Sequence, residues 1–375
     1  MMQVPVIFFI SLILVVIAIA YLCYSGVRAL RARREREKRL YDLDRHQANP
    51  IIAPNSHKEW EAEGTFNPGA VIDSDGVIHV FYRAIGRDGI SRVGHATSRD
   101  GIHFDNRSDY PVFQPRSGWG LPHVTLVPGP HTFDRVAHPS GGGWGGSEDP
   151  RVVKLNGRIY MTYTAFEGWH NMRMALTSIS EEELRANKWN WKRPVVISPA
   201  HQRAKNWVLF PEKINGKFAI LHAVSPRVMV AYVDHPELVP DIQSSKDHGG
   251  YGTKDSGRKG MWDELMKGAG APPIKTDLGW LVLYHAIQEN KYKVGAMILD
   301  RHNPSRVLYR SPEPILSPEM RYENDGKPGV VYATGAVVKD GRLYVYYGGG
   351  DKHTCVAETP LDPLLKWLMD YGKVQ

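Results

Sequence analysis

One pattern of polar and apolar positions recurs five times between residue 47 and the C-terminus. Each copy begins with a polar motif, continues as an alternating apolar strand, turns near a glycine and ends in a strand rich in Tyr, Phe and Val. Two such strands joined by a short turn are typical of a β-hairpin. The copies are FNPGAVIDSDGVIHVFYRA, GGSEDPRVVKLNGRIYMTYTA, LFPEKINGKFAILHAV, GAPPIKTDLGWLVLYHAI and YATGAVVKDGRLYVYYGGG, with turns at Asp75-Gly76, Asn156-Gly157, Asn215-Gly216, Leu278-Gly279 and Asp340-Gly341.

The spacing of the repeats indicates how they are assembled. The turns are 81, 59, 63 and 62 residues apart, and a third strand follows several hairpins, as in RVGHATS, MRMALTS and KVGAMILD. Repetition at this period with several strands per unit indicates a propeller, so we predict an all-β, five-bladed β-propeller over residues 47–375. An immunoglobulin-like sandwich would have more even spacing and no repeated entry motif. A Gly/Pro-rich insertion, 114–146, lengthens the first interval, and a polar insertion, 236–260, is predicted to be a surface loop.

The N-terminal residues have a different pattern. Residues 4–24, VPVIFFISLILVVIAIAYLCY, carry no charge and are long enough to cross a hydrocarbon core of about 30 Å. A signal peptide is the alternative, but it would have basic residues before the run and a small-residue cleavage site after it. We therefore predict a single transmembrane helix over 4–24 and a basic juxtamembrane linker over 25–46. The positive-inside rule then places the following domain on the cytoplasmic side of the membrane, as part of a single-pass protein.

The charge of the chain is concentrated in that linker. The formal charge is +7, and seven Lys and Arg against two Glu between residues 28 and 39 contribute +5 of it. This segment suits contact with anionic lipid, whereas the remainder provides no broad basic face for nucleic acid. Of the two cysteines, Cys23 lies in the predicted span and Cys355 in the domain, so no disulfide is expected within the domain. The histidines and cysteines have no metal-ligand spacing, so no metal site is indicated.

Equivalent positions of the five repeats are expected to converge on one pocket, because the innermost strand of each propeller blade runs beside the central channel. These positions provide one carboxylate that is expected to be free, several cations, and hydrogen-bonding or aromatic groups. A hydrolytic glycosidase uses two carboxylates, whereas a phosphorylase needs one proton donor and cations that hold phosphate. The candidates are Asn67, Arg83, Glu148, Asp149, Arg151, Glu212, Lys213, His222, Tyr284, His285 and Asp351.

Ten short blocks occur in the following order: FNPGA, VFYRA, SRVGHATSRDGIHF, SEDPRV, LFPEKINGKF, MWDELMKGAGAPPI, GWLVLYHAI, ILDRHNP, PILSPEMRYENDG and YVYYGGGDK. From Asn67 to Asp351 the chain therefore resembles glycoside hydrolase family 130. Members of this family are five-bladed propellers that act on β-mannosides, mostly as inverting phosphorylases. The resemblance implies a β-mannoside oligosaccharide and inorganic phosphate as co-substrates, with no other cofactor.

The resemblance also implies roles for the candidate residues. Asp149, in the block SEDPRV, is the expected general acid and would protonate the glycosidic oxygen through a hydroxyl of the bound mannose. Phosphate would attack the anomeric carbon from the opposite face and give α-mannose 1-phosphate. The candidates for holding phosphate or orienting Asp149 are Arg83, Arg151 and Lys213, and those for binding the mannoside are Asn67, His222, Tyr284, His285 and Asp351.

One position departs from the family pattern. Many members have an arginine directly after the histidine that matches His222, whereas this chain has Ala223. The missing cation keeps an inverting β-mannosidase open as an alternative activity. A non-catalytic propeller that binds a glycan is a second alternative. The linkage that is cleaved, 1,2 or 1,4, stays open.

Structural roles also stay open for several candidates. Asp149 precedes a proline and fits a strand-entry position, Lys213 fits an ion pair with Glu212, and the histidines fit core positions. Three tryptophans suit either sugar stacking or packing: Trp119, Trp144 and Trp169.

Overall fold

The computed structural model describes residues 40–114, 132–169, 171–199, 203–225, 227–236 and 257–374, together with 14, 17–19, 21, 22 and 24–28. The chain divides into two units, Met1–Tyr41 and Asp42–Gln375. Most of the predicted membrane span 4–24, residues 29–39 of the predicted linker and much of both predicted insertions lie outside the described residues. Within the described part of the chain, no helix is both long and apolar enough to cross a membrane.

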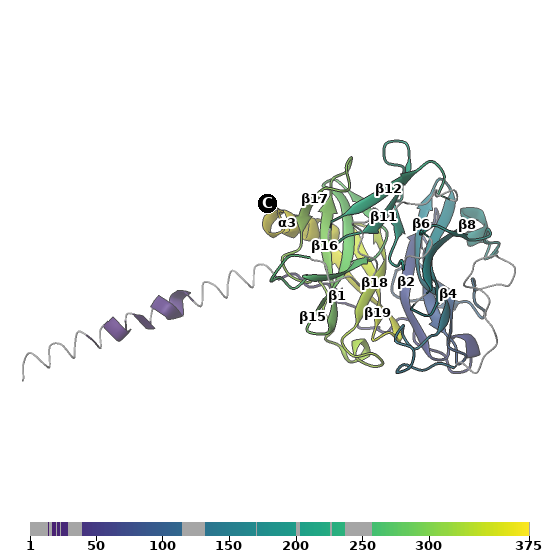
Figure 1. The fold of residues 1–375 in the computed structure, drawn as a ribbon, viewed down its shortest axis with the longest axis horizontal. Coiled ribbons are helices and arrows are strands. Elements are labelled where there is room, and N and C mark those ends of the chain that lie inside the picture. The colour runs from purple at the N-terminus through teal and green to yellow at the C-terminus, as the bar shows by residue number, and fades with distance from the viewer. Residues whose placement is uncertain are drawn as a thin grey trace, which may run out of the picture. The chain divides into compact units, whose positions relative to one another are not determined.

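The second unit consists mainly of β-strands (Figure 1). The described strands are β1 (Asp44–Arg45), β2 (Gly64–Ile72), β3 (Ile78–Ile85), β4 (Ile90–Ser98), β5 (Asn106–Arg107), β6 (Gly145–Leu155), β7 (Arg158–Glu167), β8 (Met172–Ser180), β9 (Val195–Val196), β10 (Val208–Leu209), β11 (Phe218–Ala223), β12 (Met229–Val233), β13 (Leu265–Ala269), β14 (Ile274–Thr276), β15 (Gly279–Gln288), β16 (Lys291–Leu299), β17 (Val307–Arg310), β18 (Val331–Lys339), β19 (Arg342–Gly349) and β20 (His353–Pro360). The helices are α2 (Glu181–Arg185) and α3 (Leu361–Tyr371), with 3-10 turns at Glu59–Glu61 and Arg321–Glu323.

The strands form four sheets in the described residues, with the orders β2-β3-β4-β6-β7-β8-β9, β10-β11-β12, β13-β15-β16-β17 and β1-β20-β19-β18. Strand β5 pairs with β4, and β14 pairs with β15. The first sheet contains the first two repeats, which are joined by a short parallel pairing of β4 with β6. The three predicted third strands are β4, β8 and β16.

The predicted hairpin turns are largely confirmed. At Asn156-Gly157, Asn215-Gly216 and Asp340-Gly341 both residues have positive φ, between 50° and 79°. A two-residue turn between twisted antiparallel strands requires this conformation. Gly76, with a φ of 73°, lies in the predicted turn between β2 and β3.

The fourth turn differs from the prediction by one residue. We predicted it at Leu278-Gly279, but Thr276 pairs with Gly279 and the turn residues are Asp277 and Leu278. Gly279 is the first residue of β15, where its φ is 135° and a Cβ would lie 2.2 Å from the carbonyl oxygen of Leu299. The glycine is needed for this close approach of two strands and does not form the turn itself.

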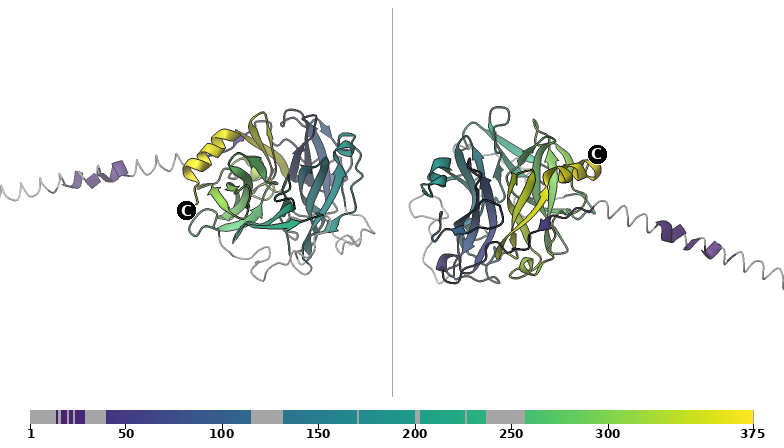
Figure 2. Two further views of the ribbon diagram at one scale, coloured as in Figure 1. Left: turned by 90° about the horizontal axis from the view of Figure 1, so that it is seen from above. Right: turned by 180° about the vertical axis from the view of Figure 1, so that it is seen from behind.

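Apolar side chains pack between neighbouring repeats rather than in one central core. Four buried clusters join the first repeat to the second, the second to the third, the third to the fourth, and the fifth to the first. In one of them the rings of Phe210 and Trp280 meet edge to face at 5.1 Å. A parallel bridge between Tyr292 and Val330 joins the fourth repeat to the fifth. Each repeat therefore contacts the next one, and the fifth contacts the first (Figure 2).

Residues near the N-terminus of this unit complete its last sheet. Strand β1 pairs with β20, with Asp44 opposite Glu358, and Arg45 forms an ion pair with the buried Glu323 at 2.8 Å. This pairing ties the two ends of the unit to one sheet.

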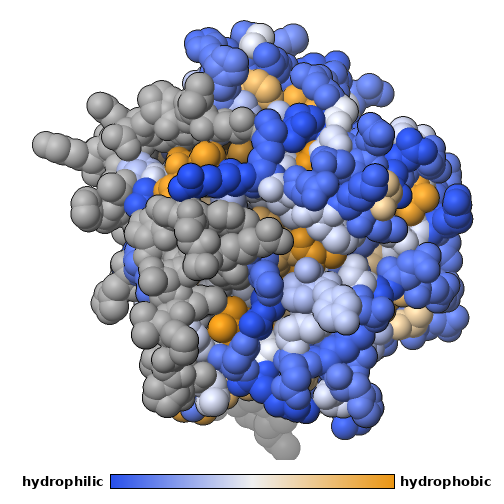
Figure 3. Space-filling view, turned by 90° about the vertical axis from the view of Figure 1, so that its right-hand side faces the viewer, coloured by the Kyte–Doolittle hydropathy of each residue, from blue (hydrophilic) through white to orange (hydrophobic). Residues whose placement is uncertain are grey.

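The surface of the unit is mainly hydrophilic with scattered apolar patches on the face drawn in Figure 3.

Tyr284, a predicted mannoside-binding residue, is part of the core of the fourth repeat. The side chain is fully buried, and its hydroxyl donates to a carboxylate oxygen of Asp263 at 2.7 Å. Asp263 also pairs with Arg258 at 2.9 Å and Arg310 at 2.7 Å. Burial keeps the pKa of Tyr284 well above its usual value, so the hydroxyl remains a donor. Its position is explained by the need to satisfy a buried carboxylate.

We predict that Tyr284→Phe lowers the free energy of unfolding by about 1–3 kcal/mol, because the buried Asp263 loses a donor. The KM for a β-mannoside should stay unchanged. Urea denaturation and steady-state kinetics measure the two quantities. Tyr232→Phe is the matched control, since Tyr232 is 38% exposed, and it should change stability by less than about 0.5 kcal/mol. An unchanged stability with a raised KM for Tyr284→Phe would contradict the structural role.

Candidate active site

A pocket lies at the strand ends where polar entry motifs from different repeats meet. Four predicted site residues line it: Asn67, Arg83, Asp149 and Asp351. They come from the first, second and fifth repeats, and the structure brings them together at one pocket. The full lining is Asn67, Arg83, Pro139, Ser140, Gly141, Asp149, Trp169, Lys205, Tyr292, Lys327, Val330, Tyr332 and Asp351.

The backbone turns these side chains toward the pocket. Asn67 and Asp149 have φ of 49° and 51° and each precedes a proline. Each also lies in an irregularity of strand pairing, between Phe66 and Gly69 in β2 and between Glu148 and Arg151 in β6. Bulges of this kind re-aim a side chain out of the alternating pattern of a strand. The motifs FNPG and SEDPR thus perform the same local task in two repeats.

Asp149 is buried among hydrogen-bond donors and cations. Its Oδ1 accepts a hydrogen bond from Asn67 Nδ2 at 2.9 Å and lies 3.4 Å from Arg83 Nη1. Burial by itself would raise the pKa of this carboxyl, but the positive charges outweigh burial and lower the pKa of Asp149 to about 2. Among the charges that lower this pKa, Arg83 has the largest effect, followed by Lys205 and Arg151. The carboxyl is therefore ionised at neutral pH in the absence of substrate.

Glu148, the neighbouring carboxylate, is committed to structural contacts. It has no exposed surface and accepts hydrogen bonds from Arg83 Nη2 at 2.8 Å, from Ser140 Oγ at 2.9 Å and from Lys205 Nζ at 2.8 Å. Both of its oxygens have partners. Glu148 therefore holds two cations beside Asp149 and is not free to act as a second catalytic carboxylate.

Arg151, a predicted phosphate-binding residue, is held behind the pocket. Its guanidinium donates to the carbonyl oxygens of Gly270 at 2.9 Å and Asp149 at 3.0 Å, and to Asn206 Oδ1 at 2.7 Å. It is 1% exposed and does not line the pocket. Its charge acts on Asp149 from behind, and its hydrogen bonds join the second, third and fourth repeats.

His285 lies behind the aromatic wall of the pocket. Its ring stacks on Tyr332 with 3.7 Å between centroids, and it is fully buried. Burial, with a further contribution from Arg151, lowers the pKa of His285 to about 3, so the imidazole is neutral. Tyr332 lines the pocket and donates its hydroxyl to Asn206 Oδ1 at 3.1 Å. His285 thus supports a pocket residue and is not itself part of the lining.

The rest of the pocket wall combines aromatic rings with cations. Lys205 Nζ lies 5.3 Å from the ring centroid of Trp169, and Lys327 Nζ lies 5.5 Å from that of Tyr292. Lys327 also lies 3.6 Å from Asp351 Oδ2. Rings of this kind suit the apolar faces of sugars, and the cations suit an anion. Among the described residues, no group of three or more His, Cys, Asp or Glu side chains is placed to hold a metal ion.

Two predicted site residues lie elsewhere. Lys213 is exposed, with its Nζ 4.7 Å from the ring of Phe218, and its neighbour Glu212 pairs with Lys275 at 2.7 Å instead. His222 packs against Trp207, with 5.3 Å between ring centroids. Neither of them lines the pocket.

Lys205 and Lys327 are pocket cations that were not predicted from the sequence. The motif in the third repeat was placed too close to the turn: Asn67 and Asp149 precede their turns by 8 and 7 residues, whereas Lys213 precedes Asn215 by only 2. Counting back 7 or 8 residues from Asn215 reaches Val208 and Trp207, whereas Lys205 lies 10 residues before Asn215, so this spacing alone does not identify it. Tyr292, Lys327 and Tyr332 lay outside the compared positions, and no spacing signal distinguishes them from packing residues.

Comparison with known proteins agrees with this geometry. Residues 137–370 match the family described as beta-1,4-mannooligosaccharide phosphorylase, glycoside hydrolase family 130. A 1,2-beta-oligomannan phosphorylase of Thermoanaerobacter sp. (strain X514) is 36% identical over 322 residues, which cover 82% of this chain and 94% of that protein. A beta-1,2-mannobiose phosphorylase of the same organism is 33% identical, with 85% and 97% covered.

Solved structures show the same fold. One, from work on family 130 glycoside hydrolases that target beta-1,2-mannosidic linkages in Candida mannan, has a TM-score of 0.69 and 26% identity over 86% of this chain and 94% of that one. The Listeria innocua beta-1,2-mannobiose phosphorylase, in complex with beta-1,2-mannobiose, has a TM-score of 0.64 and 23% identity over 88% and 99%. The chain therefore belongs to glycoside hydrolase family 130, the family of β-mannoside phosphorylases.

Proposed function

We propose that this protein cleaves β-1,2-linked mannosides with inorganic phosphate, with inversion, to give α-mannose 1-phosphate. The observation that carries the proposal is the composition of the pocket, in which one buried carboxylate, Asp149, is surrounded by cations. A hydrolase would need a second carboxylate to activate water, but Glu148 is bound on both oxygens and Asp351 lies beside Lys327. The 1,2 linkage is supported by two relatives that act on β-1,2-mannosides.

The proposed reaction uses one proton and one nucleophile. Asp149 gives its proton, through a hydroxyl of the bound mannose, to the glycosidic oxygen. A phosphate oxygen attacks the anomeric carbon from the opposite face as the bond to the leaving sugar breaks. The leaving sugar departs as an alcohol, and Asp149 is left ionised. Phosphate needs no general base because it enters as an anion.

The low pKa of Asp149 places a condition on this reaction, because an acid with a pKa of about 2 holds no proton at neutral pH. Bound phosphate would raise the pKa of Asp149. A unit charge about 5 Å away contributes roughly 3 kcal/mol at an effective dielectric constant near 20, and about 1.4 kcal/mol corresponds to one pKa unit. A phosphate dianion beside these cations would therefore raise the pKa of Asp149 to near neutral pH. Phosphate would both attack the substrate and allow the acid to bind its proton.

Lys205 and Lys327 are the lysines of the pocket lining, and we take Lys205 as the phosphate ligand because its charge also acts on Asp149. Arg83 and Arg151 are committed to several partners each and are almost fully buried. Lys205 lines the pocket, and its side chain keeps 7% exposure. It provides positive charge in a chain that has Ala223 where many relatives have an arginine.

For the fold, we propose that the five repeats are the five blades of a propeller. Besides the contacts between successive repeats, a second cavity supports this arrangement. It is lined by Ala70–Ile72, Val152–Lys154, Pro211, Pro272–Lys275 and Ala336–Val338, which is one segment from each repeat. Five such segments around one cavity are expected at the end of a central channel.

For the location, we propose that residues 4–24 anchor the protein in a membrane with the catalytic domain on the cytoplasmic side. The support is the uncharged run and the arginine-rich segment after it. Resistance of the membrane-bound protein to alkaline extraction, and its loss on deletion of residues 4–24, would test this.

The product assay tests the proposed function. With β-1,2-mannobiose, the enzyme should release mannose 1-phosphate only when phosphate is present, and β-1,4-mannobiose should react more slowly. Asp149→Asn should lower kcat by about 10²–10⁴-fold, because general acid catalysis is lost. The loss should be much smaller with a nitrophenyl β-mannoside, whose leaving group needs no proton. Equal turnover with and without phosphate would instead show the inverting β-mannosidase, and no product from any β-mannoside would show a glycan-binding protein.

Exchange of two lysines tests the phosphate site. Lys205→Met should raise the KM for phosphate by about 10- to 100-fold, because a hydrogen bond to a charged group is worth about 1.5–3 kcal/mol. Lys213→Met, the same exchange at the exposed lysine that the sequence suggested, should leave the KM unchanged. Initial rates at varied phosphate concentration measure both. The opposite ranking of the two variants would return the phosphate site to Lys213.

A further inference from the structure

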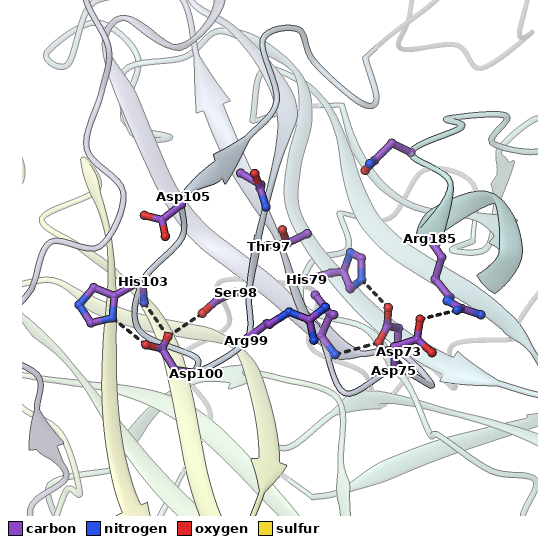
Figure 4. A pocket seen from close by; sticks show the side chains of 13 residues that line it. Asp73, Asp75, His79, Thr97, Ser98, Arg99, Asp100, His103, Asp105 and Arg185 are labelled. Atoms are coloured by element: carbon purple, nitrogen blue, oxygen red, sulfur yellow. Dashed lines mark hydrogen bonds and ion pairs between the residues drawn. The ribbon is translucent and has the colours of Figure 1, made fainter.

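A larger cavity lies at the other end of the first hairpin from Asp149. Its volume is about 550 Å³, against about 60 Å³ for the pocket at Asp149. Volumes of about 300–1,000 Å³ are typical of small-ligand sites. The cavity is formed by the turn between β2 and β3, the end of β4, the segment leading into β5, and the end of α2 (Figure 4). Asn67 and Asp73 lie six residues apart along β2 and its turn, which is about 20 Å.

Part of the wall is fixed by internal hydrogen bonds. Asp73 Oδ1 accepts from the backbone N–H groups of Asp75 and Val77, at 2.9 and 2.8 Å, and its Oδ2 lies 3.2 Å from His79 Nε2. His79 Nδ1 lies 2.9 Å from His95 Nε2, which is buried behind it. These contacts leave Asp73 and the two histidines little hydrogen-bonding capacity for a ligand. They give the cavity a rigid floor.

Two further carboxylates in the wall are also paired. Asp100 accepts from Ser98 Oγ at 2.8 Å and lies 2.7 Å from His103 Nδ1, and Asp75 forms an ion pair with Arg185 (Figure 4).

Other polar side chains in the lining have no internal partner. Within the described residues, no hydrogen bond or ion pair involves the side chains of Thr97, Arg99, Asp105, Asn106 and Asn187. All five line the same cavity. Together they offer both hydrogen-bond donors and hydrogen-bond acceptors: a guanidinium, a carboxylate, a hydroxyl and two amides. Thr97 is half-buried and the other four side chains are exposed, so all five are open to a ligand that enters the cavity.

The charges of the lining narrow the class of ligand. Four aspartates and two arginines line the cavity, so it does not favour an anion such as phosphate. Three of the four carboxylates are already paired, which leaves a cation only Asp105 as a free carboxylate. Sugar hydroxyl groups both donate and accept hydrogen bonds, and they match the mixed set. We propose that this cavity is an accessory binding site for a neutral oligosaccharide, which holds a distant part of the mannoside chain.

The identity of the sugar as a mannoside rests on the proposed function, whereas the polyhydroxylated class rests on the cavity itself. The site is separate from the chemistry, since none of its lining residues lines the pocket at Asp149. Its loss should therefore affect the binding of long chains and leave the cleavage of a disaccharide unchanged.

Binding of β-1,2-mannotriose to the full chain carrying Asp149→Asn, without phosphate, tests the proposal by calorimetry. We expect two sites per molecule. Adding Arg99→Ala and Asp105→Asn should weaken the second site by at least about 10-fold, as expected for the loss of charged hydrogen bonds. In the enzyme with Asp149 intact, the same two changes should leave kcat and KM for β-1,2-mannobiose unchanged. The matched control is Arg306→Ala with Asp277→Asn, two exposed residues of the fourth repeat, and it should leave both sites intact.

A single site in the parent, or a second site that survives the Arg99 and Asp105 changes, would overturn the proposal. So would a second site that takes spermidine or sulfate as well as it takes the sugar. Cellotriose and maltotriose serve as further probes. If only these bind, and binding is lost with the Arg99 and Asp105 changes, the oligosaccharide class is supported and the mannoside identity is overturned. This outcome is independent of the phosphorolysis assay, so the two proposals fail separately.

Discussion

Asp149 shares a buried cluster of charges with Glu148, Arg83, Arg151 and Lys205, and both the fold around the pocket and its chemistry depend on this cluster. Its members come from the first, second and third repeats, so it joins segments that are distant in sequence. Breaking a buried ion pair by removing one partner costs about 3–5 kcal/mol. The two carboxylates nevertheless differ, because Glu148 is held on both oxygens whereas Asp149 also lines the pocket. One carboxylate thus secures the cations, and the other is available for chemistry.

The local backbone makes that difference possible. Adjacent residues of a regular strand point to opposite faces, and a positive φ at Asp149 interrupts this alternation. Asn67, with a φ of 49°, does the same in β2, whereas Asp351, with a φ of 48°, lies in the turn between β19 and β20. Asn and Asp tolerate this region of φ better than other residues with a Cβ. Conformations of this kind cost about 1–3 kcal/mol each and persist where the surrounding structure holds them.

Local signals made much of this predictable. Turns such as Asn156-Gly157 depend on the conformational freedom of two adjacent residues, so the sequence alone locates them. The recurrence of the hairpins led to the convergence of Asn67, Asp149 and Asp351 on one pocket. The error at Gly279 arose because close strand approach also requires glycine, and a sequence does not show which constraint applies.

The contacts between side chains of different repeats were harder to predict from the sequence. Tyr284 has the aromatic and polar character of a sugar-binding residue, but a buried Asp263 uses its hydroxyl. Lys213 and Lys205 are chemically identical, but Lys205 lines the pocket and Lys213 does not. Strand periodicity does not predict which partner a side chain has or whether it reaches the pocket. The roles of Tyr284 and Lys205 could be assigned only from the structure.

An anion bound among the cations is expected to allow Asp149 to bind its proton. Sulfate tests this directly, because it is a dianion with no titratable proton near neutral pH. Calorimetric titration at about pH 6 in buffers of different ionisation enthalpy measures the protons taken up. We expect uptake of a large fraction of one proton per site in the native protein, because the pKa of Asp149 should rise from about 2. In Asp149→Asn the uptake should disappear. Tight sulfate binding without uptake, or equal uptake in Asp149→Asn with His285 as the acceptor, would contradict it.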